Sequence, residues 1–156
     1  MVHTTLTYLL TDDRVCLGFK KRGFGEGNWN GYGGKVDEGE TPMQSAVRET
    51  EEESAVLVAE KDLEQAAFLE FFFENGEHIG VHTYFVRIWK GEPEETEEMK
   101  PSWFLFKDIP YDLMWEDDRH WFPRALKGEK LKGKVWFDHT NKHIKKMEWE
   151  NVSTFE

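Results

Sequence analysis

The amino-acid sequence predicts an α/β protein of the α+β kind, a single domain in which β-strands surround one or two helices. Strand-like segments rich in Val, Thr and aromatic residues recur along the chain, and one strongly marked helix follows a glycine-rich turn. No run of Pro, Ser or Gly marks a linker, and the 156 residues can bury one substantial core. We therefore expect residues 1–156 to form one domain.

Strands account for most of the predicted regular structure. The turn at Thr11-Asp12-Asp13 joins the first two strands into a hairpin, and Asn75-Gly76 is a second hairpin signal. Six segments have the composition of strands: residues 3–10, 14–20, 64–73, 79–89, 102–107 and 133–139.

The best-marked helix is predicted to begin at Pro42. Thr41 is a favourable N-cap, Pro42 suits the first helical position, and Gln44 lies three residues after the cap. Five residues form a narrow stripe able to pack on a sheet: Met43, Ala46, Val47, Thr50 and Ser54. A second helix is predicted from residue 119 or 120 to 127, with Pro123 in an early turn and Gly128 at its end.

The first helix carries four carboxylates within residues 49–53. Since each helical residue advances by about 100°, Glu49, Glu52 and Glu53 fall within an arc of roughly 100°, and Glu51 points away. Carboxylates at this spacing repel one another, and a hard divalent cation with oxygen ligands is the usual reason to tolerate them. The alternative is a solvated acidic face with an ion pair from Arg48 to Glu52.

Composition narrows the function classes. A net charge of −11 disfavours binding to a nucleic-acid polymer or an anionic membrane, and permits a small anionic ligand that a metal and local cations neutralise. Cys16 is the single cysteine, so no intrachain disulfide forms and a reducing compartment fits. No signal peptide or transmembrane segment is predicted. We expect a cytoplasmic monomer whose partner is a small anionic molecule.

The spacing of glycine, arginine and acids resembles the signature of the Nudix hydrolases. Six positions over 20 residues carry the resemblance: Gly34, Glu40, Arg48, Glu49, Glu52 and Glu53. It implies a mixed β-sheet sandwiched between helices. Two positions depart from the pattern. Thr50 replaces an aliphatic residue, and we expect its hydroxyl to bond back to the carbonyl of Ala46. Ala55 replaces a glycine, and a left-handed turn there would strain alanine by about 1 kcal/mol.

Four segments outside most of this signature resemble the oxidised purine nucleoside triphosphatases, the 8-oxo-dGTP diphosphatase branch of the family. They are residues 20–25, 29–36, 98–101 and 115–118. The resemblance implies hydrolysis of oxidised purine nucleoside triphosphates, such as 8-oxo-dGTP and 2-oxo-dATP, to the monophosphate and pyrophosphate. It implies Mg²⁺ as cofactor, with Mn²⁺ as a substitute.

Carboxylates are the candidate catalytic groups and metal ligands. The proposed ligands are Glu49, Glu52, Glu53 and Glu98, with the carbonyl of Gly33 added by resemblance. Glu53 and then Glu98 rank first as the base that accepts a proton from water, although clustered carboxylates titrate as a set. Arg48 is expected to orient them, and a surface salt bridge is the alternative.

Further residues are expected to bind the substrate. Glycines at 31, 33 and 34 allow a tight turn from which Lys35 reaches a phosphate. Trp115 is expected to stack on the base, with Trp121 as a further wall. One of the adjacent acids Asp117 and Asp118 is expected to hold a proton and donate while the other accepts; helix capping is the alternative. The resemblance completes the set with Thr5, Lys20, Phe24, Asn30, Tyr32, Gly34 and Phe71.

Other functions stay open at this point. The signature fits a Nudix hydrolase that acts on another diphosphate-linked substrate, such as ADP-ribose or a dinucleoside polyphosphate. An inactive nucleotide-binding module would not need the acidic cluster, and an interaction protein would use the Trp-rich segment 103–149. Glu116 replaces a proline that is usual in the resembled branch, so the pocket loop is expected to be less rigid. The six histidines and the last 25 residues suggest no chemistry.

Overall fold

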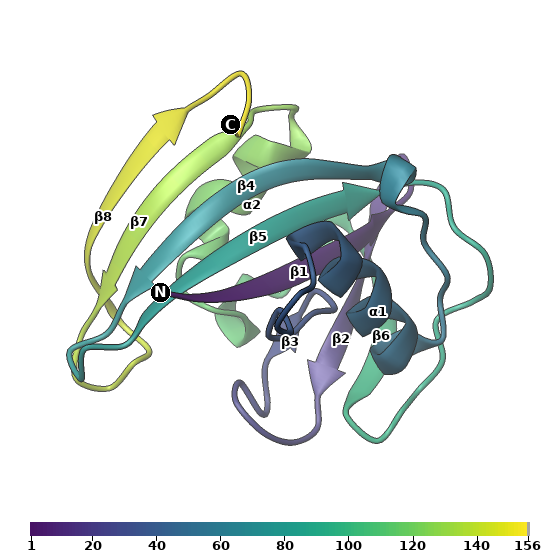
Figure 1. Cartoon of the computed structure of the whole chain (residues 1–156), viewed down its shortest axis with the longest axis horizontal. Coiled ribbons are helices and arrows are strands. Elements are labelled where there is room, and N and C mark those ends of the chain that lie inside the picture. The colour runs from purple at the N-terminus through teal and green to yellow at the C-terminus, as the bar shows by residue number, and fades with distance from the viewer. Residues whose placement is uncertain (156) are drawn as a thin grey trace.

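The computed structural model describes residues 1–155. Within them a mixed sheet of eight strands is accompanied by two α-helices, α1 (Pro42–Ser54) and α2 (Asp118–Leu126). Figure 1 shows α1 in front of the sheet and α2 behind it. The predicted fold class, a mixed sheet between helices, is confirmed. Neither helix in this part of the chain is long and apolar enough to cross a membrane.

The strands follow a mixed order. They are β1 (Val2–Leu10), β2 (Arg14–Lys20), β3 (Trp29–Asn30), β4 (Leu63–Phe72), β5 (His78–Val86), β6 (Met99–Leu105), β7 (Leu131–Phe137) and β8 (Ile144–Asn151). Along the sheet they run β3-β2-β1-β5-β4-β7-β8, and β6 pairs with β2. The β1–β5 and β4–β7 pairs are parallel, and the others are antiparallel. Three 3-10 turns complete the elements: Glu60–Asp62, Phe106–Asp108 and Tyr111–Leu113.

Most predicted elements are present with small shifts in their ends. The strand predicted at 14–20 matches β2, and those at 3–10, 64–73 and 133–139 match β1, β4 and β7 within two residues. The strand predicted at 79–89 ends at Val86, and the one at 102–107 begins at Met99. Strands β3 and β8 were not predicted, because β3 has two residues and β8 is rich in Lys and Glu.

Alternation along the strands creates a hydrophobic core on each face of the sheet. Tyr8 and Leu10 of β1 pack in the cluster that contains Trp121 and Phe122 of α2. Leu9, between them in sequence, packs with Ala46 of α1 on the opposite face. The sheet therefore has a covered surface on both sides of β1.

Helix α1 is fixed by the cap that the sequence predicted. The Thr41 hydroxyl accepts a hydrogen bond from the Gln44 N–H, and the Gln44 side chain accepts one from the Thr41 N–H. The Thr50 hydroxyl donates to the carbonyl of Ala46 at 2.7 Å, as expected. The helix therefore tolerates the polar residue on its buried face.

Ala55 ends α1 in a left-handed conformation, with φ 65° and ψ 12°. A side chain with a Cβ is strained in this region, and glycine is not. We expect Ala55→Gly to raise the free energy of unfolding by about 0.5–1 kcal/mol, measured by urea denaturation. The matched control is Ala59→Gly, since Ala59 is also exposed but has φ −99°. An equal effect of both substitutions would contradict strain at residue 55.

Candidate active site

A glycine-containing segment, residues 31–36, lies against β1 where β1 and β2 have diverged. The paired β1–β2 residues are Leu9 with Cys16 and Leu10 with Val15. Nearer the N-terminus, the Thr5 N–H donates to the carbonyl of Gly34 at 2.9 Å. A Cβ on Gly33 would lie 1.6 Å from the Thr5 carbonyl oxygen, so this approach requires glycine.

Gly33 joins this segment to α1. Its N–H donates a hydrogen bond of 2.7 Å to Oε1 of Glu53, a carboxylate on α1 that is 3% exposed. This bond joins the glycine-containing segment to the last turn of α1.

The acidic residues singled out in the sequence line one cavity of about 480 Å³. Its walls include Glu49, Glu52, Glu53 and Glu98, together with Gly33, Gly34 and Lys20. The Glu49 carboxylate lies so close to Gly34 that a Cβ there would be 2.7 Å from it. Glu51 is exposed and is not among the lining residues, as its place on the helix predicts.

Two cations hold these carboxylates. Nζ of Lys20 lies 3.7 Å from Glu53 and 3.5 Å from Glu98. Arg48 forms a wider network than the predicted pair with Glu52 alone. Its guanidinium contacts four carboxylates within 3.3 Å: Asp37, Glu40, Glu49 and Glu52. Arg48 thus joins α1 to the loop before it.

The carboxylates of the acidic cavity are paired with cations in this structure. Among residues 1–155, no three His, Cys, Asp or Glu side chains are grouped closely enough to hold an ion. Glu49 and Glu52 contact Arg48, whereas Glu53 and Glu98 contact Lys20. The donors are nevertheless all oxygen, which suits Mg²⁺. Burial raises the pKa of Glu53 to about 8.

A second cavity, of about 340 Å³, adjoins the acidic one. Four residues line both: Lys20, Gly33, Gly34 and Glu53. Ten of the eleven predicted substrate-binding residues line this cavity, namely Thr5, Lys20, Phe24, Asn30, Gly34, Lys35, Phe71, Trp115, Asp117 and Asp118.

Two aromatic side chains named in the sequence analysis do not line the cavity. Tyr32 does not line the cavity, because its side chain is fully buried in the core beside α1, where its hydroxyl lies 3.5 Å from Sγ of Cys16. Trp121 is also fully buried and is not a lining residue. Its ring forms part of the core beneath α2. Its indole N–H donates to the carboxylates of Asp117 and Asp118.

Asp117 and Asp118 form a buried acidic pair in the wall of the second cavity. The indole N–H of Trp121 lies 3.0 Å from Oδ2 of Asp117 and 3.1 Å from Oδ1 of Asp118. Oδ1 of Asp117 and Oδ2 of Asp118 have no hydrogen-bond partner within the described chain. Asp117 occupies the N-cap position of α2 without a capping bond from its side chain, so capping does not explain the pair.

Burial sets the protonation of this pair. It raises the pKa of Asp117 to about 7, and burial together with the Asp117 charge raises that of Asp118 well above its usual value. The folded protein therefore keeps protons that the unfolded chain releases near pH 4.

This proton uptake predicts a pH-dependent stability. Because the folded state binds more protons than the unfolded state between about pH 4 and 7, stability falls as the pH rises through that window. We expect the free energy of unfolding to drop by about 2 kcal/mol from pH 5 to pH 7 through Asp117 alone. Urea denaturation at both pH values measures the drop. Asp117→Asn should reduce it, and the exposed control Asp112→Asn should not.

The same cavity combines an oriented amide with apolar walls. Oδ1 of Asn30 accepts from the Gly31 N–H at 2.9 Å and from the Tyr8 hydroxyl at 3.3 Å, which leaves the amide NH₂ free to donate. The ring of Trp115 lies 5.2 Å from Phe24 and 6.2 Å from Phe71.

The sequence analysis missed the aliphatic lining and the role of Tyr8. The missed lining residues are Leu6, Leu69, Ile79, Val81 and Met99. Leu69 lies two residues before Phe71 on β4, and Ile79 and Val81 alternate on β5. Alternation along the predicted strands was the signal that could have found them.

The chain matches a known protein family over most of its length. The family model for the NUDIX domain matches residues 2–125. The chain belongs to the Nudix family. The segment from Gly34 to Glu53, which resembles the Nudix signature, supplies Gly34, Glu49, Glu52 and Glu53 to the acidic cavity. Strands β7 and β8 lie beyond the matched residues.

Two relatives and one solved structure illustrate the relationship of this Nudix protein. The chain is 44% identical over 134 residues to the oxidized purine nucleoside triphosphate hydrolase of Mus musculus, with 85% of each protein covered. It is 44% identical over 130 residues to the protein of the same name from Danio rerio, with 83% of this chain and 82% of that one covered. The crystal structure of the mutator MutT protein from Bacillus halodurans gives a TM-score of 0.82 at 22% identity, over 96% of this chain and 98% of that one.

Proposed function

We propose that the protein hydrolyses oxidised purine nucleoside triphosphates to the monophosphate and pyrophosphate and so removes them from the nucleotide pool. One observation carries the proposal: a cavity lined by a buried acidic pair adjoins a cavity lined by Glu53 and its neighbouring carboxylates, and the acidic pair lines only the first. A single ligand with a purine at one end and phosphates at the other fits this arrangement. The names of the two vertebrate relatives support the same substrate class.

Glu53 is the proposed base for the attacking water. The Gly33 N–H and the Lys20 ammonium hold its two oxygens in place, and an ionised carboxylate there can accept the proton of the attacking water. Arg48 positions Glu49 and Glu52. The carbonyl of Gly33 and the carboxylates of Glu49, Glu52, Glu53 and Glu98 would hold Mg²⁺, or Mn²⁺ in its place. When bound, the ion supplies positive charge that neutralises the phosphates and polarises the phosphoryl group.

The cations at the junction of the cavities are proposed to bind phosphate oxygens. Lys20 lines both cavities and already contacts two carboxylates of the acidic one. Lys35, in the segment beside β1, lines the second cavity. Ammonium groups attract phosphate charge, so these residues would orient the chain of phosphates toward Glu53.

The other cavity is proposed to read the base. Trp115 supplies an aromatic face for stacking, and Asn30 presents an amide donor. Of Asp117 and Asp118, the protonated carboxyl donates to a base carbonyl and the ionised one accepts from ring N–H groups. Normal and oxidised purines differ in the carbonyl and ring N–H groups on their edges. The acidic pair would therefore distinguish oxidised from normal bases.

Steady-state hydrolysis tests the proposal. With Mg²⁺ present, we compare 8-oxo-dGTP, 2-oxo-dATP, dGTP, dATP and ADP-ribose, and measure pyrophosphate separately from phosphate. We expect much higher kcat/KM for the oxidised triphosphates, with the monophosphate and pyrophosphate as products. A higher kcat/KM for ADP-ribose than for the triphosphates would show that the protein is a Nudix hydrolase of another substrate class. No turnover of any compound would support a binding module.

We further propose that residues 1–156 act as one domain and as a monomer in the cytoplasm. Strands β7 and β8 join the sheet of the Nudix segment, which supports one folding unit. The net charge of −11 disfavours nucleic-acid polymers and anionic membranes as partners. Size-exclusion chromatography with light scattering tests the monomer.

A further inference from the structure

The pocket loop, residues 115–118, is joined to the C-terminal hairpin by the side chain of Glu116. Its Oε2 lies 2.9 Å from Nδ1 of His143, and its Oε1 accepts a hydrogen bond of 3.2 Å from the backbone N–H of Ile144. Strand β8 begins at Ile144, outside the residues that the family model matches. The loop that carries the acidic pair is thus fastened to a separate part of the chain.

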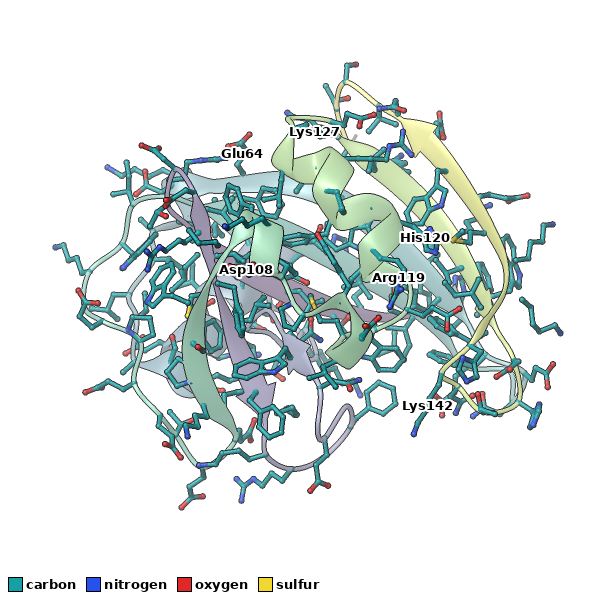
Figure 2. The ribbon with its side chains drawn as sticks, turned by 180° about the vertical axis from the view of Figure 1, so that it is seen from behind. Glu64, Asp108, Arg119, His120, Lys127 and Lys142 are labelled. Carbon is teal, nitrogen blue, oxygen red and sulfur yellow. The ribbon has the colours of Figure 1, made fainter. Side chains whose placement is uncertain are left out.

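The turn that receives Glu116 has its own hydrogen bonds. The Asp138 N–H donates to the carbonyl of His143 at 2.8 Å, and the Asp138 carbonyl accepts from the Asn141 N–H at 3.0 Å. Figure 2 labels Lys142 in this turn on the same side of the molecule as Arg119 in the first turn of α2. The β7–β8 turn can therefore serve as a fixed anchor for the loop.

The same hairpin supports the base-stacking residue. The ring of Trp115 lies 5.8 Å from that of Phe137, the last residue of β7, in an edge-to-face contact. Asp117 and Asp118 each keep one buried oxygen without a partner, so Trp121 alone does not fix both carboxyl groups. Their placement depends on how firmly the backbone of the loop is held.

We propose that Glu116 is a positioning residue that holds Trp115, Asp117 and Asp118 in place for the base by fastening the pocket loop to the β7–β8 turn. In the branch that the chain resembles, a proline usually stiffens the loop at this place through its ring. Here two hydrogen bonds that one carboxylate accepts, from His143 and from the Ile144 N–H, have the same effect. The bond from His143 also holds the pKa of Glu116 below its usual range, so the carboxylate is ionised at neutral pH.

Hydrogen exchange of the backbone amides of residues 115–118 tests the fastening without any substrate. We expect about fivefold faster exchange in Glu116→Ala and in His143→Ala, and an intermediate rate in Glu116→Gln, which keeps an acceptor for the Ile144 N–H. His143 is 68% exposed, so its substitution leaves the fold intact. The matched control is Glu74→Ala. It removes a 2.9 Å ion pair to Lys145, which lies next to Ile144 on strand β8.

Kinetics test the positioning role, which rests on the proposed function. For 8-oxo-dGTP we expect KM to rise about fivefold in Glu116→Ala while kcat stays within about twofold, because base placement changes and the hydrolytic groups do not. The double variant Glu116→Ala/His143→Ala should resemble Glu116→Ala alone. If exchange and KM in Glu116→Ala match those of Glu74→Ala, the proposal is overturned. If the wild type does not use 8-oxo-dGTP, the exchange rates still decide the fastening.

Discussion

Glu53→Gln is expected to lower kcat for hydrolysis by about 10³-fold. Glutamine cannot take a proton from the attacking water, and it removes a negative charge from the proposed ion-binding set. The amide keeps an oxygen that can accept from the Gly33 N–H, so the local structure should persist. Steady-state rates with the preferred triphosphate, together with the melting temperature of each variant, measure the effect.

The chain offers a matched control on the same helix. Glu51→Gln changes an exposed carboxylate that lines neither cavity. We expect its kcat to stay within about twofold of the wild type. A loss in Glu51→Gln as large as that in Glu53→Gln would mean that overall charge, and not the position of Glu53, governs the rate. Near-normal activity of Glu53→Gln would assign the base to another group, with Glu98 next.

Asp117→Asn and Asp118→Asn are expected to shift base preference in opposite directions. Two close buried carboxylates share one proton, and a base with a different pattern of donors and acceptors needs that proton on the other residue. Asparagine fixes a donor at the substituted position. The ratio of kcat/KM for 8-oxo-dGTP to that for 2-oxo-dATP should therefore rise in one variant and fall in the other, each by about 10-fold or more.

Each variant must also be compared for a single substrate. For 8-oxo-dGTP alone, the two variants should differ strongly in kcat/KM, since one replaces the donor and the other the acceptor. Equal and small losses in both would reject the shared-proton account. Asp112→Asn, at an exposed aspartate five residues before Asp117, is the control for nonspecific charge effects.

Local patterns in the sequence were enough for most elements but not for every strand. The capping residues and apolar stripe of α1 predicted its start and buried face, because both depend on neighbours along one helix. Strand β8 was missed because Lys145, Lys146, Glu148 and Glu150 make it resemble a solvated loop. Its pairing with β7 is a long-range contact that composition does not report.

The site was predictable where spacing alone places a side chain. Helical periodicity placed Glu49, Glu52 and Glu53 along one cavity. In the glycine-rich segment no such rule applied, and Tyr32 was assigned to the substrate although its ring lies in the core. The role of Glu116 depends on His143, 27 residues away, and no local pattern joins the two.

The junction between the two cavities would select the phosphorus to be attacked by its distance from the base. Gly33 and Gly34 line both cavities, and the Gly33 N–H is bonded to Glu53, so this segment connects Glu53 to the cavity that contains the acidic pair. With the base bound at the acidic pair as proposed, the phosphorus that lies beside Glu53 would be attacked, regardless of how many phosphates follow it. A diphosphate would release phosphate, and a tetraphosphate would release triphosphate, with the same monophosphate left in each case.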